Sequence, residues 1–99
     1  MSASLKGIRV LELAQIMAGP TCGLLLADLG AEVIKIEKTP SGDDTRNFLP
    51  PEINGESAAF MMMNRNKKGI ALNLKDKDGI EIFKTMVKNS DVVLENFRK

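Results

Sequence analysis

The segment that most constrains the fold of this chain is residues 7–38, GIRVLELAQIMAGPTCGLLLADLGAEVIKIEK. It begins with IRVLEL, a short run of aliphatic and β-branched residues that is typical of a strand covered on both faces. Gly19 and Pro20 then mark a turn, and Pro20 suits the first position of a helix because its missing N–H costs nothing there. After Gly30, which suits the left-handed residue that ends a helix, EVIKIE alternates as a strand does. The segment therefore predicts a β-α-β unit with its helix over residues 20–29.

The rest of the chain continues the alternation of strands and helices. Residues 38–56 contain three of the four prolines, which predicts a long surface loop. Ser57 is suited to cap a short helix, while IALNL at residues 70–74 and DVVLE at residues 91–95 predict strands. Between these strands, Asp76 is placed to cap a helix whose apolar residues recur every three or four positions and predict one buried stripe. The stripe consists of Ile80, Phe83, Met86 and Val87.

Strands that alternate with helices favour the α/β class, in which a parallel sheet carries helices on its faces. In such sheets, ligands bind beyond the carboxyl ends of the strands. In this chain those ends are predicted at Leu13, Glu37, Leu74 and Glu95. The residues that follow them are therefore the candidates for a binding site.

Composition argues against several classes of function. Fourteen Lys and Arg against thirteen Asp and Glu give a net charge of +1, which supplies no overall field for nucleic acid. The chain has no histidine and one cysteine, so we expect no metal site and no Ser-His-Asp site within it. The longest uncharged run, residues 13–27, is too short and too broken by Gly and Pro to cross a bilayer, and no basic, apolar leader precedes it. We therefore expect a cytoplasmic protein that binds neither nucleic acid nor membranes.

The turn AQIMAGPTCG allows two interpretations. In the first, it is a dinucleotide-binding loop, and Glu37, at the end of the second strand, contacts a ribose. Against this, the spacing of Gly19 and Gly23 is not G-x-G-x-x-G, and Pro20 removes an amide donor that a pyrophosphate needs. In the second interpretation, which the spacing favours, the two glycines permit close packing of the helix on the strand.

A cysteine and a pair of carboxylates are further candidates for chemistry. Cys22 lies in the first turn of the predicted helix, where backbone N–H groups favour a thiolate, but without a histidine partner we expect a small buried apolar residue instead. Asp43 and Asp44 lie in the Pro- and Gly-rich loop. Neighbouring carboxylates in such loops more often form turns or face solvent than act as an acid/base pair.

Several cations are placed near the predicted strand ends. Arg65, Lys67 and Lys68 would ordinarily form a solvated turn. Beside Lys38, Arg98 and Lys99, however, they predict a rim that binds phosphate oxygens. The chain has no Trp or Tyr, and its four Phe fall mostly on predicted apolar faces, so the exposed aromatics typical of nucleic-acid binding are missing. A discrete phosphorylated small molecule therefore fits better than a polymer.

Five motifs follow one another over essentially the whole chain: LKGIRVLEL, MAGPTCGLLLADLGAEVIKIEK, GDDTR, NRNKKGIALNLK and DVVLENFR. In this order and spacing they resemble the N-terminal part of the class III coenzyme A transferases. That family includes formyl-CoA and carnitine-CoA transferases and 2-methylacyl-CoA racemases. The resemblance implies a Rossmann-like, three-layer α/β fold with a parallel sheet. Because family members are much longer and form interlocked homodimers, we expect residues 1–99 to be the N-terminal part of the large CoA-binding domain, with the remainder of the enzyme absent.

The resemblance also implies which residues contact coenzyme A. Met17 and Ala18 match contacts in the turn after the first strand, and since the family often has Gln at the position of Met17, only a backbone or apolar contact is carried over. Lys38 matches a position that is commonly Arg and lies against the adenosine end, where lysine keeps the charge but not the bidentate fork. The remaining contacts lie at two later strand ends: Leu72, Asn73, Leu74 and Lys75 at one, and Asn96, Phe97 and Arg98 at the other.

The activity that the resemblance implies is the transfer of coenzyme A between carboxylic acids through acyl intermediates on an aspartate, which divides one difficult step into easier ones. The expected ligands are acyl-CoA, with coenzyme A as the acyl carrier, and carboxylic acids. The family's aspartate lies beyond Lys99 and no aspartate of this chain matches it, so we expect no catalytic residue here and no activity from these residues alone. Two alternatives stay open: an acyl-CoA racemase of the same family, and a non-catalytic nucleotide-binding or interaction module.

Overall fold

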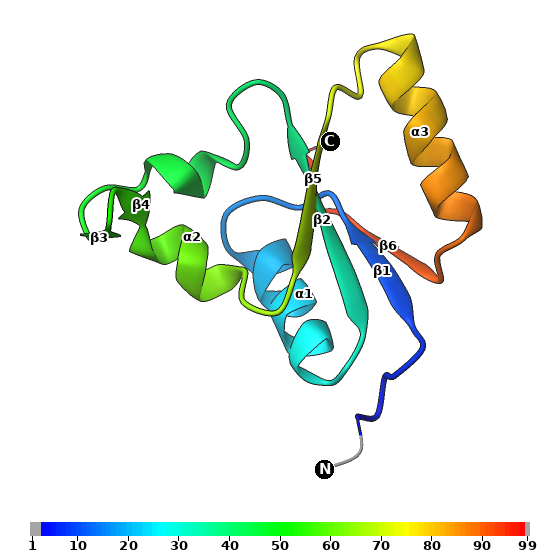
Figure 1. The fold of residues 1–99 in the computed structure, drawn as a ribbon, viewed down its shortest axis with the longest axis horizontal. Helices are drawn as coiled ribbons and strands as arrows, with labels where there is room; N and C mark the ends of the chain where they lie inside the picture. The colour runs from blue at the N-terminus through cyan, green and yellow to red at the C-terminus, as the bar shows by residue number, and fades with distance from the viewer. Residues whose placement is uncertain (1–2, 99) are drawn as a thin grey trace.

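A computed structural model describes residues 3–98, which form a four-stranded parallel sheet with helices on both faces (Figure 1). The strands lie in the order β5-β2-β1-β6, and each neighbouring pair is parallel. Their bounds are Arg9–Glu12 for β1, Glu32–Lys38 for β2, Lys68–Leu72 for β5 and Val92–Leu94 for β6. The predicted α/β class with a parallel sheet is thereby confirmed.

Helices α1 (Ala18–Asp28) and α3 (Lys77–Lys88) lie against opposite faces of the sheet. Because successive strand residues point to opposite faces, Val10 of β1 joins the cluster with Ala27 of α1, while Leu11 joins the cluster that receives Phe83 of α3. The same alternation turns every second residue of β1 and β2 toward α1. On that face the apolar residues Val10 and Val33 are followed by Glu12 and Lys35, and all of these side chains are buried.

The ends of the elements differ from the predicted ones for local reasons. α1 begins at Ala18, two residues before the predicted start, and tolerates Pro20 because N–H groups of the first turn have no partner inside the helix. Gly30 has φ +104°, as predicted for the residue that ends this helix. β5 ends at Leu72 rather than Leu74, because Asn73 turns the chain and its side-chain oxygen accepts from the N–H of Lys75.

The segment predicted as a plain surface loop is more ordered than expected. It contains the 3₁₀ helix η1 (Asp44–Asn47) and a hairpin of β3 (Glu52–Ile53) and β4 (Glu56–Ser57), followed by α2 (Ala58–Met63). Ser57 caps α2 as predicted, accepting from the N–H of Phe60. Asp43 and Thr45 are buried, so the prediction that this whole segment lies on the surface was wrong.

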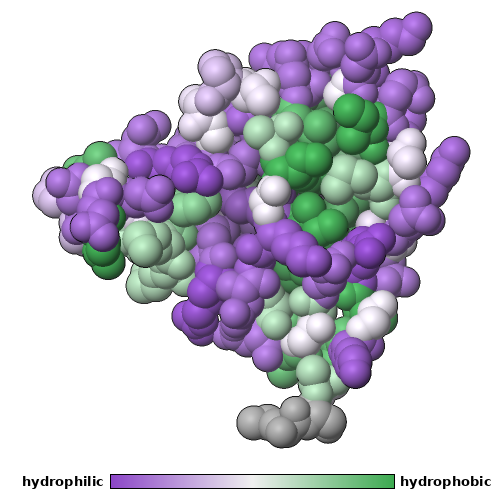
Figure 2. All heavy atoms as spheres, in the orientation of Figure 1, coloured by the Kyte–Doolittle hydropathy of each residue, from purple (hydrophilic) through white to green (hydrophobic). Residues whose placement is uncertain are grey.

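The apolar stripe predicted for α3 is only partly buried. Phe83 and Met86 pack on the sheet, but Ile80 and Val87 are exposed. Apolar side chains accordingly gather on the visible face between β5 and α3 (Figure 2). Asp76 occupies the N-cap position of α3 but its side chain makes no capping hydrogen bond, contrary to the prediction. None of the helices within residues 3–98 has the length and apolar character needed to span a membrane.

Candidate functional site

The carboxyl ends of the parallel strands share one edge of the sheet, and the direction of winding reverses there. β1 lies between β2 and β6, so the connections from β1 and from β5 leave toward opposite sides. Such a switch point leaves room above the sheet, and it is where open α/β sheets bind ligands. Two adjoining cavities open at this edge, and Gln15 and Phe97 line both of them.

The first, the β2–β5 cavity, has a volume of about 200 Å³ and is lined by the ends of β1, β2 and β5 together with Phe97. Lys38 and Lys75 supply positive charge there, and Leu13, Ile36 and Leu72 supply apolar wall. Every predicted contact from the β2 and β5 ends lies in it: Lys38, Leu72, Asn73, Leu74 and Lys75.

The second, the β1–β6 cavity, has a volume of about 530 Å³ and lies between the turn after β1 and the chain after β6. It brings together the remaining predicted contacts, Met17, Ala18, Asn96, Phe97 and Arg98. Its lining also includes Gln15, Ile16 and Asp44, which were not among the predicted contacts with coenzyme A. Gln15 could have been predicted as a lining residue, because it follows the end of the first strand. Nothing in the sequence of the Pro- and Gly-rich loop indicated that Asp44 would lie at this edge of the sheet.

The turn between β1 and α1 is held by the side chain of Asn96. Its oxygen accepts from the N–H of Gln15 at 3.1 Å, and its amide nitrogen donates to the carbonyl of Gln15 at 3.0 Å. The next residue, Ile16, has φ +71°, a conformation that costs a β-branched residue about 1–3 kcal/mol. Asn96 is thus engaged with the chain itself, and a strained backbone presents Met17, which is 60% exposed, to the cavity.

The predicted cationic rim is only partly present. Lys38 lies at the site edge and pairs with Asp44 at 2.8 Å, both side chains being about half exposed. Lys99 lies outside the described residues. Arg65, Lys67 and Lys68 do not join this rim. They pair instead with Asp28, Glu12 and Glu32, respectively. The prediction failed because it placed the turn before β5 at the same edge as its end, whereas a parallel strand begins toward the other edge.

The glycines of the first turn permit close packing, as the second interpretation predicted. A Cβ on Gly19 would overlap Ala14, and a Cβ on Gly23 would overlap the carboxylate of Glu12. Glu37, the ribose contact of the dinucleotide interpretation, is held by a bidentate contact with Arg46 at 2.7 and 2.8 Å. That interpretation therefore has neither an open loop nor a free acid.

Cys22 is exposed, so its predicted role as a buried apolar residue was wrong. It lies on the outer side of α1, because the buried side of the helix is formed by Gly19, Pro20, Gly23, Leu24 and Ala27. Among residues 3–98, no group of three or more His, Cys, Asp or Glu side chains is arranged to hold a metal ion.

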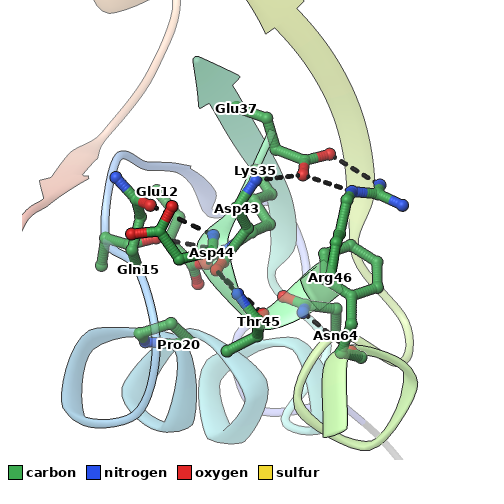
Figure 3. Close-up of polar contacts among 12 residues, drawn as sticks. Glu12, Gln15, Pro20, Lys35, Glu37, Asp43, Asp44, Thr45, Arg46 and Asn64 are labelled. Carbon is green, nitrogen blue, oxygen red and sulfur yellow. Dashed lines mark hydrogen bonds and ion pairs between the residues drawn. The ribbon is translucent and has the colours of Figure 1, made fainter. Parts of the chain in front are cut away.

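Four buried charged side chains contact one another and form the buried quartet: Glu12, Lys35, Asp43 and Lys67. Figure 3 labels the first three of them. Lys35 Nζ lies 3.0 Å from Glu12 Oε2 and 2.6 Å from Asp43 Oδ2, and Lys67 Nζ lies 2.8 Å from Glu12 Oε1. Each side chain is at most 3% exposed. In the sequence, only the alternation along the two strands indicated that Glu12 and Lys35 point toward the face of the sheet that α1 covers.

The surroundings of the quartet shift the pKa of two members. Burial lowers the pKa of Lys67, although hydrogen bonding to Glu12 opposes the shift. For Asp43, burial raises the pKa, but hydrogen bonds from Lys35 and Thr45 outweigh it and the net shift is downward. Outside the quartet, the hydrogen bonds from Arg46 lower the pKa of Glu37, and burial only partly opposes this shift.

We expect the free energy of unfolding of the full chain to fall steeply in acid. Glu37 and Asp43 have folded-state pKa values below their ordinary 4.5 and 3.8, so the unfolded chain binds more protons as the pH drops. Their stabilisation is complete above about pH 5 and is lost as the pH falls below 4.5 and through the folded-state values. Urea unfolding followed by circular dichroism between pH 7 and pH 3 checks this, and a midpoint independent of pH down to 3 would contradict it.

Comparison with known proteins decides the family. The family described as CoA-transferase family III matches residues 5–99 of this chain. The chain belongs to CoA-transferase family III. This confirms the resemblance drawn from the motifs.

Named relatives of this CoA-transferase family III chain are themselves CoA-transferases. It is 50% identical over 93 residues to succinyl-CoA:glutarate CoA-transferase of Mus musculus, covering 94% of this chain and 21% of that protein. It is 42% identical over 97 residues to formyl-CoA:oxalate CoA-transferase of Afipia carboxidovorans, covering 98% of this chain and 23% of that protein. The chain therefore spans between a fifth and a quarter of the length of these relatives.

Solved structures show the same fold. A CAIB/BAIF family protein from Brucella suis superposes with a TM-score of 0.90 at 44% identity, covering 98% of this chain and 26% of that one. The orthorhombic form of Rv3272 from M. tuberculosis superposes with a TM-score of 0.87 at 38% identity, covering 97% of this chain and 26% of that one. The arrangement of strands and helices in residues 3–98 is thus that of the family.

Proposed function

We propose that these residues are part of an enzyme that transfers coenzyme A between carboxylic acids, and that the β2–β5 and β1–β6 cavities are its binding site for the nucleotide and pantetheine portions of coenzyme A. The observation that carries the proposal is the convergence of residues from distant parts of the chain. Lys38, Lys75 and Arg98 come from three different strand ends and line two adjoining cavities at the carboxyl edge of the sheet.

The chemistry of each cavity suits a different part of the ligand. The apolar walls of the β2–β5 cavity, with Phe97 at its edge, suit an adenine ring, and the ammonium groups of Lys38 and Lys75 suit phosphates. The carboxylate of Asp44 lies 2.8 Å from Lys38 Nζ on an exposed surface, and the ammonium group of Lys38 has further donors. A phosphate group can accept from these donors while Asp44 keeps the Lys38 side chain in place. The β1–β6 cavity then receives the thiol end beside Met17.

The acyl-transfer step needs a nucleophile that this part of the chain does not offer. Asp44 is the one carboxylate among the described residues that line the two cavities, and it is paired with Lys38. We propose that an aspartate outside these residues attacks the thioester carbonyl, expels the coenzyme A thiolate and forms an acyl anhydride, and that residues 3–98 bind and orient the ligand. By this proposal they form the N-terminal part of the large domain of a homodimeric cytoplasmic enzyme and have no activity alone. The printed names of the relatives favour a transferase over a racemase.

Replacing Lys38 or Lys75 by Ala should weaken coenzyme A binding by about tenfold each, because a charge-assisted phosphate contact is worth roughly 1.5–3 kcal/mol and solvent exposure reduces that value. Isothermal titration calorimetry of the whole protein with coenzyme A measures the effect. Lys38→Arg should bind at least as tightly as the unchanged protein, since a guanidinium keeps the charge and adds a planar fork.

Lys84→Ala is the matched control, because Lys84 is exposed on α3 and lies away from both cavities. Its dissociation constant should equal that of the unchanged protein. Equal affinities for all the variants would remove Lys38 and Lys75 from the site, and absence of any binding by the unchanged protein would reject the proposed function.

A further inference from the structure

The buried quartet ties together four segments of the chain. Glu12 ends β1, Lys35 lies in β2, Asp43 precedes η1 and Lys67 precedes β5. Lys35 also donates to the carbonyl of Ala14 at 3.1 Å. Lys67 donates to the carbonyl of Pro20 at 2.9 Å and to the side-chain oxygen of Asn64 at 3.1 Å. The loop after β2 is therefore attached to the sheet through one member of the quartet, Asp43.

Asp43 organises its loop through every polar group of its side chain and through its backbone. Oδ1 accepts from both the N–H and the hydroxyl of Thr45, at 2.9 and 2.8 Å, while Oδ2 lies 2.6 Å from Lys35 Nζ. The N–H of Asp43 donates to Glu37, and that carboxylate also receives Arg46. These contacts fix the direction in which the next residue, Asp44, leaves the loop (Figure 3).

Asp44 is the point at which the loop meets the proposed coenzyme A site. Its N–H donates to the side-chain oxygen of Gln15 at 3.3 Å, and its carboxylate pairs with Lys38 at 2.8 Å. Gln15 lines both cavities, Lys38 lines the β2–β5 cavity and Asp44 lines the β1–β6 cavity. A shift of the loop would therefore alter both cavities at once.

The stability of the fold alone does not explain why the residues that attach the loop to the sheet, Lys35 and Asp43, are charged. Burying an ion pair costs about as much in lost hydration as its attraction returns, and well-packed apolar residues often replace such pairs without loss of stability. An apolar contact is not directional, whereas the contacts of Asp43 allow one placement of the loop. This difference separates a positioning role from a purely stabilising one.

We propose that the Lys35–Asp43 ion pair is a positioning device for the ligand site, which holds residues 43–46 so that Asp44 orders Gln15 and Lys38. The proposal rests on the proposed function for its ligand and on the geometry of the loop for its mechanism. Asp43 and Lys35 contact no cavity of the site directly, so both act through Asp44.

The first test is Asp43→Asn in the whole protein, which keeps the acceptor for Thr45 but removes the charge that faces Lys35. We expect amide hydrogen exchange at Asp44 and Arg46 to accelerate by about tenfold beyond any change at the amides of β1 and β2, which report global stability, and coenzyme A to bind about tenfold more weakly. The matched control is Asp91→Asn, an exposed carboxylate at the opposite edge of the sheet, which accepts from the N–H of Arg9. It should change neither quantity.

The second test separates position from stability. In the double variant Lys35→Met with Asp43→Leu, apolar packing replaces the pair, so we expect the melting temperature to return to near that of the unchanged protein while exchange at Asp44 stays fast and binding stays about tenfold weaker. Recovery of slow exchange and tight binding together with stability would overturn the proposal. Should Asp43→Asn not fold, this variant and the milder Thr45→Val, which removes one hydrogen bond to Asp43, decide the question.

Failure of the proposed function has a different signature. If the unchanged protein does not bind coenzyme A, the function is rejected, and the exchange rates at Asp44 still show whether the ion pair positions the loop. If coenzyme A binds and Asp43→Asn changes neither exchange nor affinity, the positioning role is rejected and the function stands.

Discussion

Glu12→Gln should destabilise the full chain by about 3–5 kcal/mol at pH 7, the cost of leaving buried charges without their partner. The substitution keeps the size of the side chain, so no cavity forms and the effect reports charge. Lys35 and Lys67 lie 3.0 and 2.8 Å from the Glu12 carboxylate and would then share the single negative charge of Asp43. Urea unfolding monitored by circular dichroism measures the loss in free energy.

The pH dependence of this loss identifies its cause. Burial already lowers the pKa of Lys67, and without Glu12 this lysine can relieve the uncompensated charge by releasing its proton. Less free energy is needed for that release as the pH rises toward 10.5, the ordinary pKa of the group, so the destabilisation should shrink between pH 7 and pH 9.5. A loss that stays constant over this range would show that Glu12 acts through packing rather than charge.

Glu32→Gln is the control for Glu12→Gln. Glu32 also pairs with two cations, Arg9 and Lys68, but its side chain is 33% exposed and its partners more so. Water and salt screen such pairs, so this change should cost far less than the same change at Glu12. Equal losses at the two positions would mean that burial does not set the strength of these ion pairs.

The sheet and the strand-end site could be predicted from the sequence because both depend on local patterns. The alternation of strands with helices determines the class of fold, and parallel strands bring Lys38 and Lys75 to one edge whatever lies between them. The helix ends were less predictable, since Pro20 is compatible with several positions of a first turn. Exposure of Ile80 and Val87 could not be predicted either, because the periodicity of a helix shows which residues share a face but not how closely that face packs.

The loop and the quartet could not be predicted because their contacts join segments distant in sequence. Lys67 reaches Glu12 across 55 positions of the chain. Asp43 is close to Lys35 in sequence, but it lies in a Gly- and Pro-rich segment, which predicts turns rather than the partners of its side chains. Arg65, Lys67 and Lys68 have the composition of a solvated turn. Only the structure shows that the side chain of Lys67 is buried against Glu12. The alternation in β1 and β2 did contain a signal, since it places Glu12 and Lys35 on the same face as Val10 and Val33.

Gly23→Ala should lower the free energy of unfolding by roughly 2 kcal/mol or more, although alanine is the better helix former. The gain in helix propensity is about 1 kcal/mol. Against it, the new methyl group would overlap the carboxylate of Glu12 and lie 3.3 Å from Lys67 Nζ. Overpacking of this kind costs about 1–3 kcal/mol, and pushing the carboxylate away from its ammonium partners adds to that cost.

Gly69→Ala and a double-mutant cycle test this explanation of Gly23. A Cβ on Gly69 in β5 would meet nothing within 4 Å, so that change should leave stability nearly unaltered. Glu12→Asp shortens the buried acid and should make room for the methyl group, so the loss in the double variant should be smaller than the sum of the two single losses by about 1 kcal/mol or more. Additive losses would mean that the two residues do not compete for the same space. Gly23 would then be required by the backbone of α1. A large coupling energy would instead show that Gly23 is required because α1 packs on the carboxylate of Glu12.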